Sequence, residues 1–329
     1  MKEFAYLRPV TVQDAVATVN DVPGARYLAG GTNLIDLIKA GVERPSRLVD
    51  LQDLPLDRIE VTHDGGLRIG AMVANSDLAA HPEVRRRYPG LAKAVLAGAS
   101  GQLRNMATVG GNLLQRTRCA YFIDTNRRCN KRKPGSGCPA IAGEHHNMAI
   151  LGASNRCVAT NPSDMAVALA AFDAVVTVVT TEGTSEVPLS EFYLPVEDTP
   201  ERETALSPGA LITAVTVPAA PVASRSTYRK VRERASYAFA NGSVAAALDV
   251  RHGRVHDVRL AFGAVASRPW RASRAEEVLL GAPATAEVFG AAVDAELRDA
   301  KPLPHNAYKI DLMRNLAVAV LLELTESSR

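Results

Sequence analysis

The chain has 329 residues, about twice the length of an ordinary domain, so we expect two domains. Apolar residues make up 47% and charged residues 22% of the chain, as in folded globular proteins, which excludes a disordered, collagenous or coiled-coil protein. A net charge of +3 and an aromatic content of 5% exclude the clustered basic surface and the stacking platforms of a nucleic-acid-binding protein.

The sequence shows neither a targeting segment nor a membrane segment. The first ten residues include Lys2 and Arg8 and lack the apolar core of a secretory signal. The most apolar stretches, 165–179 and 316–322, are interrupted by Asp173 or are too short to span a membrane. We therefore expect a soluble chain that is cytoplasmic by default, with export to the periplasm together with a partner subunit as the alternative.

The first part of the chain is typical of an α/β unit. Thr11–Asp14 has the pattern of a capping box, which predicts a helix through Val19. Gly30–Thr32 ends a short strand, and apolar residues recur at helical spacing directly after it. The elements predicted up to residue 99 are strands at 26–29, 47–51 and 67–73, a helix at 33–39, a helix capped by Ser76, and helical segments over 82–99.

Periodicity is lost between Gln115 and Asn161, and a loop of this length inside a domain is usually functional or disordered. Farther along, the prolines and small residues of 218–221 predict a linker, and strands followed by helices after it predict an α+β domain. The elements predicted after the loop are a helix at 164–172, strands at 174–181 and 211–217, a hairpin of 243–250 and 255–266 that turns at 251–254, and helices at 273–280, 285–299 and 306–324.

The segment Ala29–Leu34, with the sequence AGGTNL, lies where a predicted strand meets a predicted helix. Glycines lack a Cβ and let the backbone approach a bulky anion, and the amides at a helix N-terminus favour negative charge. The segment is therefore a candidate cradle for a pyrophosphate. A tight turn that opens a helix explains the same residues equally well.

A second glycine pair lies in Thr108–Asn112, between a hydroxyl and an amide that can bond to phosphate or ribityl oxygens. Each pair alone is a weak signal, but one long dinucleotide explains both better than coincidence does. Gly135–Ala140 matches the string G-x-G-x-x-A of dinucleotide-binding folds. It follows a basic segment and not a strand, so we reject a Rossmann site.

All four cysteines of the chain lie within the loop, at Cys119, Cys129, Cys138 and Cys157, which indicates a shared ligand. They lack the tight pairs of structural zinc sites and the spacings of ferredoxins. A disulfide framework is disfavoured because a chain of this size needs no staples. Seven Lys or Arg residues between positions 116 and 133 would offset the charge of four thiolates. An iron–sulfur cluster, a zinc ion and unligated thiols remain open, in that order of preference.

Three further segments admit both a structural and a functional interpretation. Pro162–Asp164 is the expected start of a helix, and N-capping by Ser163 is the favoured role. The cations of Tyr228–Arg232 could meet a phosphate or an adenine, but a solvated strand face is favoured. Adjacent histidines on a loop point in different directions, so we reject a metal site at His145–His146.

Taken together, these residues resemble the FAD-binding subunits of the xanthine dehydrogenase and carbon monoxide dehydrogenase family of molybdenum hydroxylases. Ala29–Leu34 and Thr108–Asn112 are similar to the two flavin motifs of that family, and the resemblance extends through Pro162–Asp164 and Leu211–Ile212 to Tyr228–Lys230. It implies an α+β fold with a FAD-binding domain of the vanillyl-alcohol oxidase (PCMH) type. The division implied is a FAD-binding domain at 1–220, with subdomains at about 1–55 and 56–220 and a cluster-binding loop at 115–160, and a CO-dehydrogenase-flavoprotein-like domain at 221–329.

The resemblance also implies which residues bind FAD. The glycine motifs would hold the pyrophosphate, Asp164 would bond to the ribityl chain or ribose, and Lys230 would lie near the adenine. Asn33 stands where the family often has Asp or His, a change of little consequence where the backbone does the binding. Either Tyr193 or Tyr237 could cover the isoalloxazine. The implied FAD-binding residues are Leu28, Ala29, Gly30, Gly31, Thr32, Asn33, Leu34, Thr108, Gly110, Gly111, Asn112, Asp164, Leu211, Ile212 and Lys230.

The cysteine loop resembles an insertion in the flavin subunits of bacterial periplasmic aldehyde oxidoreductases, which carry an extra [4Fe–4S] cluster. By this resemblance, Cys119, Cys129, Cys138 and Cys157 would bind such a cluster in addition to the FAD of the chain.

The implied function is electron transfer within an oxidoreductase complex, with no catalytic residue on this chain. A large molybdopterin subunit would oxidise an aldehyde, a small [2Fe–2S] subunit would relay the electrons, and FAD would deliver them to an external acceptor. Two alternatives remain. A zinc-stapled interaction module explains the cysteines but not the glycine pairs, and a stand-alone flavin oxidase explains the glycine pairs but not the cysteine loop.

Overall fold

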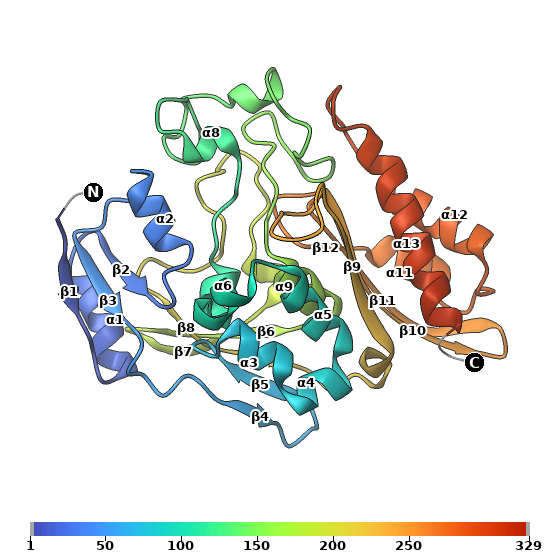
Figure 1. The fold of residues 1–329 in the computed structure, drawn as a ribbon, viewed down its shortest axis with the longest axis horizontal. Coiled ribbons are helices and arrows are strands. Elements are labelled where there is room, and N and C mark those ends of the chain that lie inside the picture. The colour runs from blue at the N-terminus through green and yellow to red at the C-terminus, as the bar shows by residue number, and fades with distance from the viewer. Residues whose placement is uncertain (1–2, 327–329) are drawn as a thin grey trace.

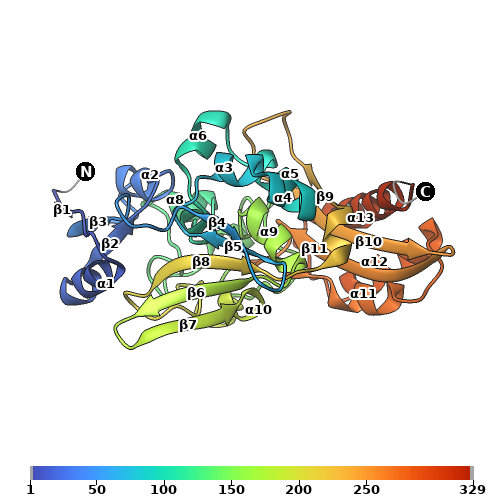
Figure 2. The same cartoon turned by 90° about the horizontal axis from the view of Figure 1, so that it is seen from below.

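The computed structural model describes residues 3–326, which form three units side by side along the long axis of the molecule (Figures 1 and 2). The expected α+β class is confirmed, because helices combine with one parallel and two antiparallel sheets. The ends of the expected domains, residues 1–2 and 327–329, lie outside the described part. No helix within the described residues is long and apolar enough to cross a bilayer.

The N-terminal unit is a three-stranded parallel sheet of order β1-β3-β2 with two helices. The predicted capping box is confirmed, because the Thr11 hydroxyl accepts a hydrogen bond of 3.1 Å from the Asp14 amide. The elements are β1 (Ala5–Leu7), α1 (Val12–Asp21), β2 (Ala25–Leu28), α2 (Leu34–Lys39) and β3 (Arg47–Asp50).

The central unit contains a five-stranded antiparallel sheet of order β4-β5-β8-β6-β7. Helices α3 to α6 lie on one side of this sheet (Figure 2). The strands are β4 (Ile59–Val61), β5 (Leu67–Gly70), β6 (Val175–Thr180), β7 (Gly183–Pro188) and β8 (Leu211–Val217). The helices are α3 (Asn75–Ala80), α4 (Pro82–Arg87), α5 (Pro89–Ala97), α6 (Gly101–Met106), α7 (Val109–Leu113), α9 (Asp164–Ala171) and α10 (Leu189–Phe192).

Two local predictions in this unit were wrong. Ser76 does not cap α3, because the helix begins at Asn75, whose amide bonds to the Ala107 carbonyl at 2.8 Å. The predicted strand at 67–73 ends at Gly70. Strand β7 was not predicted from the sequence, because it lies at the sheet edge and its exposed polar residues follow no apolar alternation.

The cysteine loop forms the top of the molecule in Figure 1, between α2 and the start of α13. It is mostly irregular, as its lack of periodicity predicts, and contains α8 (Ala120–Ile123) and a short 3₁₀ helix, η1 (Pro139–Ile141). Its last part is tied to the C-terminal unit, because the amides of Ile150 and Leu151 both bond to the Val265 carbonyl.

The C-terminal unit is a four-stranded antiparallel sheet of order β12-β11-β10-β9. The predicted hairpin is confirmed, with His252 and Gly253 at positive φ in its turn. The elements are η2 (Pro221–Arg225), β9 (Ser226–Val231), β10 (Gly242–Arg251), β11 (Arg254–Gly263), β12 (Trp270–Arg271), α11 (Ser273–Leu279), α12 (Ala286–Leu297) and α13 (Tyr308–Glu326).

This sheet is buried on both faces. Alternate residues of β10 point to opposite sides, so Val244 and Ala246 pack with the C-terminal helices whereas Ala245 and Ala247 join the core of the central unit. The segment predicted as a linker leads into η2, where Val222 and Ala223 are also buried in the central core. The C-terminal sheet therefore lies between the core of the central unit and the C-terminal helices.

Candidate functional site

The first glycine motif lies against the segment that precedes the second. A Cβ on Gly30 would lie 1.6 Å from the Met106 carbonyl oxygen, so only glycine permits this contact. Gly31 has φ +73°, a conformation that other residues rarely adopt. Two segments that are distant in the sequence are therefore in contact, as one shared ligand requires.

The two motifs differ in the amides that they can offer to an anion. The N–H groups of Gly31, Thr32 and Asn33 make no hydrogen bond with another described residue. In the second motif, Gly110 donates to the Ala71 carbonyl at 2.8 Å and Gly111 donates to the Thr108 hydroxyl at 3.3 Å. The first motif is therefore the one with amides available for a diphosphate.

A cavity of about 560 Å³ opens beside both motifs, within the size range of about 300–1,000 Å³ that is typical of cofactor sites. Its walls come from all three units and from the cysteine loop. The implied FAD-binding residues on its wall are Thr32, Asn33, Gly111, Asn112, Asp164 and Lys230.

The remaining implied FAD-binding residues do not line this cavity. Thr108 acts indirectly, because its hydroxyl caps the N-terminus of α7, the helix that contains the second glycine pair. Leu211 and Ile212 lie on β8, where their side chains are buried in two different apolar clusters. The other implied residues outside the lining are Leu28, Ala29, Gly30, Gly31, Leu34 and Gly110, which adjoin it in the two motifs.

Asp164 and Lys230 form a buried ion pair on the cavity wall, at 2.8 Å between Nζ and Oδ2. The Tyr228 hydroxyl donates to the other carboxylate oxygen at 2.5 Å, and burial raises the pKa of Tyr228 well above its ordinary value. The solvated strand face favoured from the sequence was therefore wrong for Lys230, whose side chain is only 3% exposed. These bonds fix the Asp164 carboxylate where α9 begins.

Ser163 connects α9 to the second glycine motif. Its hydroxyl accepts from the Ala166 amide at 3.0 Å, which confirms the predicted N-cap, and donates to the Asn112 side chain at 2.6 Å. The Asn112 amide oxygen also accepts from Gln115 at 2.9 Å. The N-terminus of α9 and the motif thus form one hydrogen-bonded wall.

Several polar residues of the cavity were not predicted from the sequence. Asn75, from the start of α3, lies on the wall with a buried side-chain oxygen that has no partner in the described chain. The side-chain nitrogen of Asn33 is also buried and has no hydrogen-bond partner in the described chain. Unpaired buried polar atoms are costly, so these two groups fit a site that binds a polar ligand. Asn75 belongs to no motif, so it could not be recognised as a site residue from its neighbours in the sequence.

An aromatic loop between β9 and β10 borders the same cavity. Tyr237 is 56% exposed and has φ +52°. The Arg118 guanidinium lies over the Phe239 ring, 5.0 Å from its centre. Burial lowers the pKa of Arg118. Tyr193, by contrast, is buried away from this cavity and donates to the Leu113 carbonyl at 2.8 Å. Of the two tyrosines considered from the sequence, only Tyr237 is at the cavity.

The four cysteines line one small cavity in the loop. Cys157 is buried, and Cys119 lies on the wall of both this cavity and the large one. A hydrogen bond between Cys138 and Cys157 lowers the pKa of the first thiol and raises that of the second, while burial raises the pKa of Cys119. Within the described residues, no three or more His, Cys, Asp or Glu side chains are grouped to hold a metal ion.

Asn130, another residue missed from the sequence, ties the cysteine segments together. Its side-chain oxygen accepts from the Gly137 amide at 2.7 Å, beside Cys138. Its side-chain nitrogen donates to the Arg156 carbonyl at 2.7 Å, beside Cys157. Since Asn130 itself follows Cys129, one buried amide orients three of the four cysteines.

The comparisons with known proteins cover nearly the whole chain. Residues 2–220 match the FAD binding domain in molybdopterin dehydrogenase, and residues 226–324 match the CO dehydrogenase flavoprotein C-terminal domain. The aldehyde oxidoreductase FAD-binding subunit PaoB of Escherichia coli K12 is 51% identical over 98% of both chains. The glyceraldehyde dehydrogenase medium chain of Sulfolobus acidocaldarius is 27% identical over 85% of this chain and 82% of its own.

Solved structures share the fold. Carbon monoxide dehydrogenase from Hydrogenophaga pseudoflava superposes with a TM-score of 0.77 at 24% identity, over 99% of this chain and 98% of that one. Quinoline 2-oxidoreductase from Pseudomonas putida 86 gives a TM-score of 0.76 at 23% identity, over 100% and 99%. With both family models matched along its length, this chain belongs to the FAD-binding subunits of the molybdenum hydroxylase family.

Proposed function

We propose that this chain is the FAD- and [4Fe–4S]-carrying electron-transfer subunit of a molybdenum-dependent aldehyde oxidoreductase. The likeness to PaoB over nearly the full length of both chains favours an aldehyde among the substrates of the family. One structural observation carries the redox role. The four cysteines gather at one cavity, and one of them, Cys119, also lies on the wall of the candidate FAD cavity.

FAD would bind in the large cavity, where it would accept an electron pair and pass it on. The open amides of Gly31–Asn33 would bind the diphosphate, because three adjacent N–H groups provide a positive surface. Asn33 and Asn75 would give their unpaired side-chain atoms to the polar part of the cofactor. Asp164, held by Tyr228 and Lys230, would accept from a sugar or ribityl hydroxyl without changing position.

The donor set of the loop fits an iron–sulfur cluster, because four cysteine thiolates are the ligands that a [4Fe–4S] cluster takes. All four cysteines of the loop line one small cavity. A cluster bound by Cys119, Cys129, Cys138 and Cys157 would supply one-electron transfer beside FAD.

We further propose that the chain acts only within a complex. A small [2Fe–2S] subunit and a large molybdopterin subunit would supply the electrons, as in the multi-subunit organisation of the family. Residues 1–220 and 221–329 would be its two domains, in agreement with the two family models. A stand-alone oxidase would not need the cysteine loop, and a zinc-stapled module would not need the flavin cavity.

The redox role is tested in the assembled complex with the variant Cys129→Ser. Stopped-flow absorbance after mixing with aldehyde follows FAD reduction, while iron and sulfide content reports the loss of the cluster. We expect FAD reduction at least tenfold slower in a complex that still assembles. Ser136→Ala is the matched control, because Ser136 accepts from the Cys129 amide at 3.1 Å without being a ligand. Unchanged FAD reduction without the cluster would refute a role in electron transfer.

A further inference from the structure

One cation of the basic loop differs from the others because it is buried at the cysteine cavity. Lys131 lines that cavity, and its side chain is only 5% exposed. Its ammonium lies 2.7 Å from the Glu203 carboxylate and donates to the Pro200 carbonyl at 2.9 Å.

Two other basic residues of the loop, Arg128 and Arg156, also line the cysteine cavity, but both are exposed. Arg127, Arg128 and Lys133 are exposed, so water screens their charges. Arg132 donates to main-chain carbonyls, including those of Tyr121 and Asp124. Among the loop cations described in the structure, Lys131 alone combines burial with a place at the cysteine cavity. Water therefore screens the charge of Lys131 from the sulfurs less than it screens the charges of the exposed cations.

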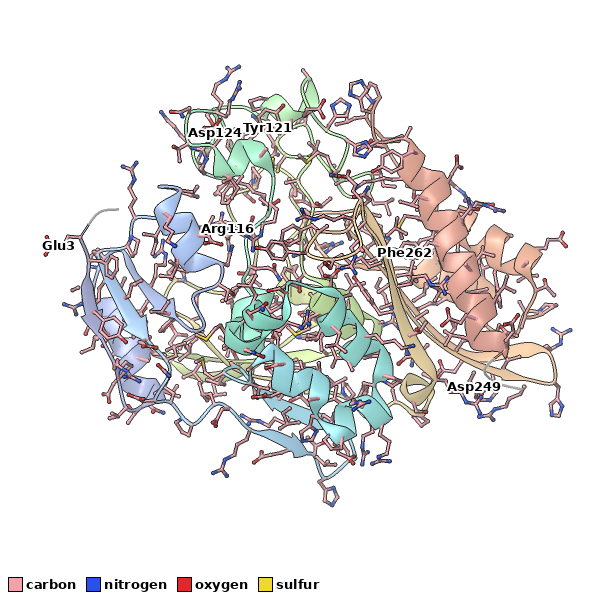
Figure 3. All side chains as sticks on the ribbon, viewed as in Figure 1. Glu3, Arg116, Tyr121, Asp124, Asp249 and Phe262 are labelled. Atoms are coloured by element: carbon pink, nitrogen blue, oxygen red, sulfur yellow. The ribbon has the colours of Figure 1, made fainter. Side chains whose placement is uncertain are left out.

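Lys131 is the end of a chain of ion pairs that leads away from the cysteines. Glu203 also pairs with Arg116 at 2.6 Å, Arg116 pairs with Glu43 at 3.1 Å, and Glu43 pairs with Arg26 at 3.7 Å. Figure 3 shows Arg116 on the segment that leads to α8, beside the N-terminal unit. The signs alternate and a cation stands at each end, so the network presents a positive charge to the cysteine cavity.

We propose that Lys131 sets the reduction potential of the cluster, with Glu203 acting in the opposite direction. This inference rests on the proposed function. Four thiolates around a [4Fe–4S]²⁺ core carry a net charge of −2, and uptake of one electron makes it −3. A cation close to the cluster favours the more negative state, and an anion disfavours it, because net charge near a cluster tunes its potential. Lys131 would thus act on the cluster through its charge and would not be a ligand.

The test is an anaerobic redox titration of the full chain, followed by the low-temperature EPR signal of the reduced cluster. Lys131→Met should lower the equilibrium constant for reduction at least tenfold, which corresponds to about 59 mV for one electron. Glu203→Gln should raise that constant. Lys131→Arg keeps the charge and should leave the constant within threefold of the wild type. Lys133→Met, an exposed neighbour, is the matched control and should also leave it within threefold.

Iron and sulfide are measured first, which separates the two proposals. A wild-type chain without a four-iron cluster refutes the proposed function. If the cluster is present, unchanged constants, or shifts of the same sign in Lys131→Met and Glu203→Gln, overturn the role of Lys131. If Lys131→Met loses its cluster, Lys131→Arg and Glu203→Gln are compared instead. A purely structural role of Lys131 predicts no rise of the equilibrium constant for reduction in Glu203→Gln, so an unchanged constant in that variant overturns the electrostatic role.

Discussion

At the scale of single residues, backbone conformation matters as much as side-chain chemistry. Gly30 permits a contact that any Cβ would prevent, and Gly31 takes a left-handed conformation beside the three open amides. These two requirements explain why the motif contains adjacent glycines. They also predict different failures, since a change at Gly30 separates two segments whereas a change at Gly31 alters the cradle itself.

Gly31→Val should yield a folded chain without flavin. A β-branched residue disfavours φ +73°, and its Cβ would also lie 3.1 Å from Ile35. Gly253→Val is the control, because Gly253 has φ +74° in a hairpin turn with open space around it. Visible absorbance of the purified variants measures bound flavin. Normal flavin content in Gly31→Val would rule out the proposed cradle.

A buried lysine predicts a pH-dependent stability. Lys309 is fully buried, donates to the Ala264 carbonyl at 2.8 Å, and has its pKa lowered by burial to about 7. Between this value and the unfolded value of about 10.4, the folded chain binds fewer protons at Lys309 than the unfolded chain does. The contribution of this group to stability therefore rises with pH across that interval.

Lys309→Met removes the ammonium and keeps the length of the side chain. The free energy of unfolding of the variant minus that of the wild type should be about 3 kcal/mol larger at pH 6 than at pH 9.5, because the wild type loses stability as the pH falls through this interval. Urea denaturation at the two pH values measures the difference. A relative stability that does not change with pH would mean that Lys309 has the same proton affinity in both states.

At the scale of elements, local patterns predict what local contacts determine. The Thr11 cap, the hairpin turn at His252–Gly253 and the start of α9 at Ser163 each depend on residues close in sequence. Ser76 shows the limit of this reasoning. It is a good capping residue, but the contact of Asn75 with the Ala107 carbonyl, far along the chain, sets where α3 begins.

Arg271, on β12, joins the C-terminal sheet to the end of α9. Its guanidinium donates to the Ala170 carbonyl at 2.7 Å, pairs with Asp173 at 3.2 Å, and lies 2.6 Å from Glu276. Burial raises the pKa of Glu276, and Arg271 opposes this effect. Loss of the arginine would leave helix carbonyls and a largely buried carboxylate without their cation.

Arg271→Met should therefore lower the free energy of unfolding by about 2–3 kcal/mol. The exposed pair of Arg274 with Asp299 provides the control, and Arg274→Met should lower stability much less than Arg271→Met does, because water screens the exposed pair. Equilibrium denaturation of both variants at neutral pH measures the two effects. Equal losses would show that Arg271 acts only as another surface charge.

At the scale of the whole molecule, the sequence could predict which segments matter but not how they meet. The glycine pairs and cysteines stand out in the sequence, and the fold class follows from the family. Three features depend on contacts between segments that are far apart in the sequence. They are the contact of Gly30 with Met106, the position of Cys119 at two cavities, and the burial of the C-terminal sheet on both faces. Asn75 and Asn130 escaped prediction because their roles depend on the same convergence.

The most direct test of the account is the cofactor content of the full chain, purified without oxygen and measured as FAD, iron and acid-labile sulfide per polypeptide. We predict one FAD, four iron atoms and four sulfides. A chain that lacks flavin, or one that holds zinc at its cysteines in place of iron, would contradict the assignment of both cavities to electron transfer.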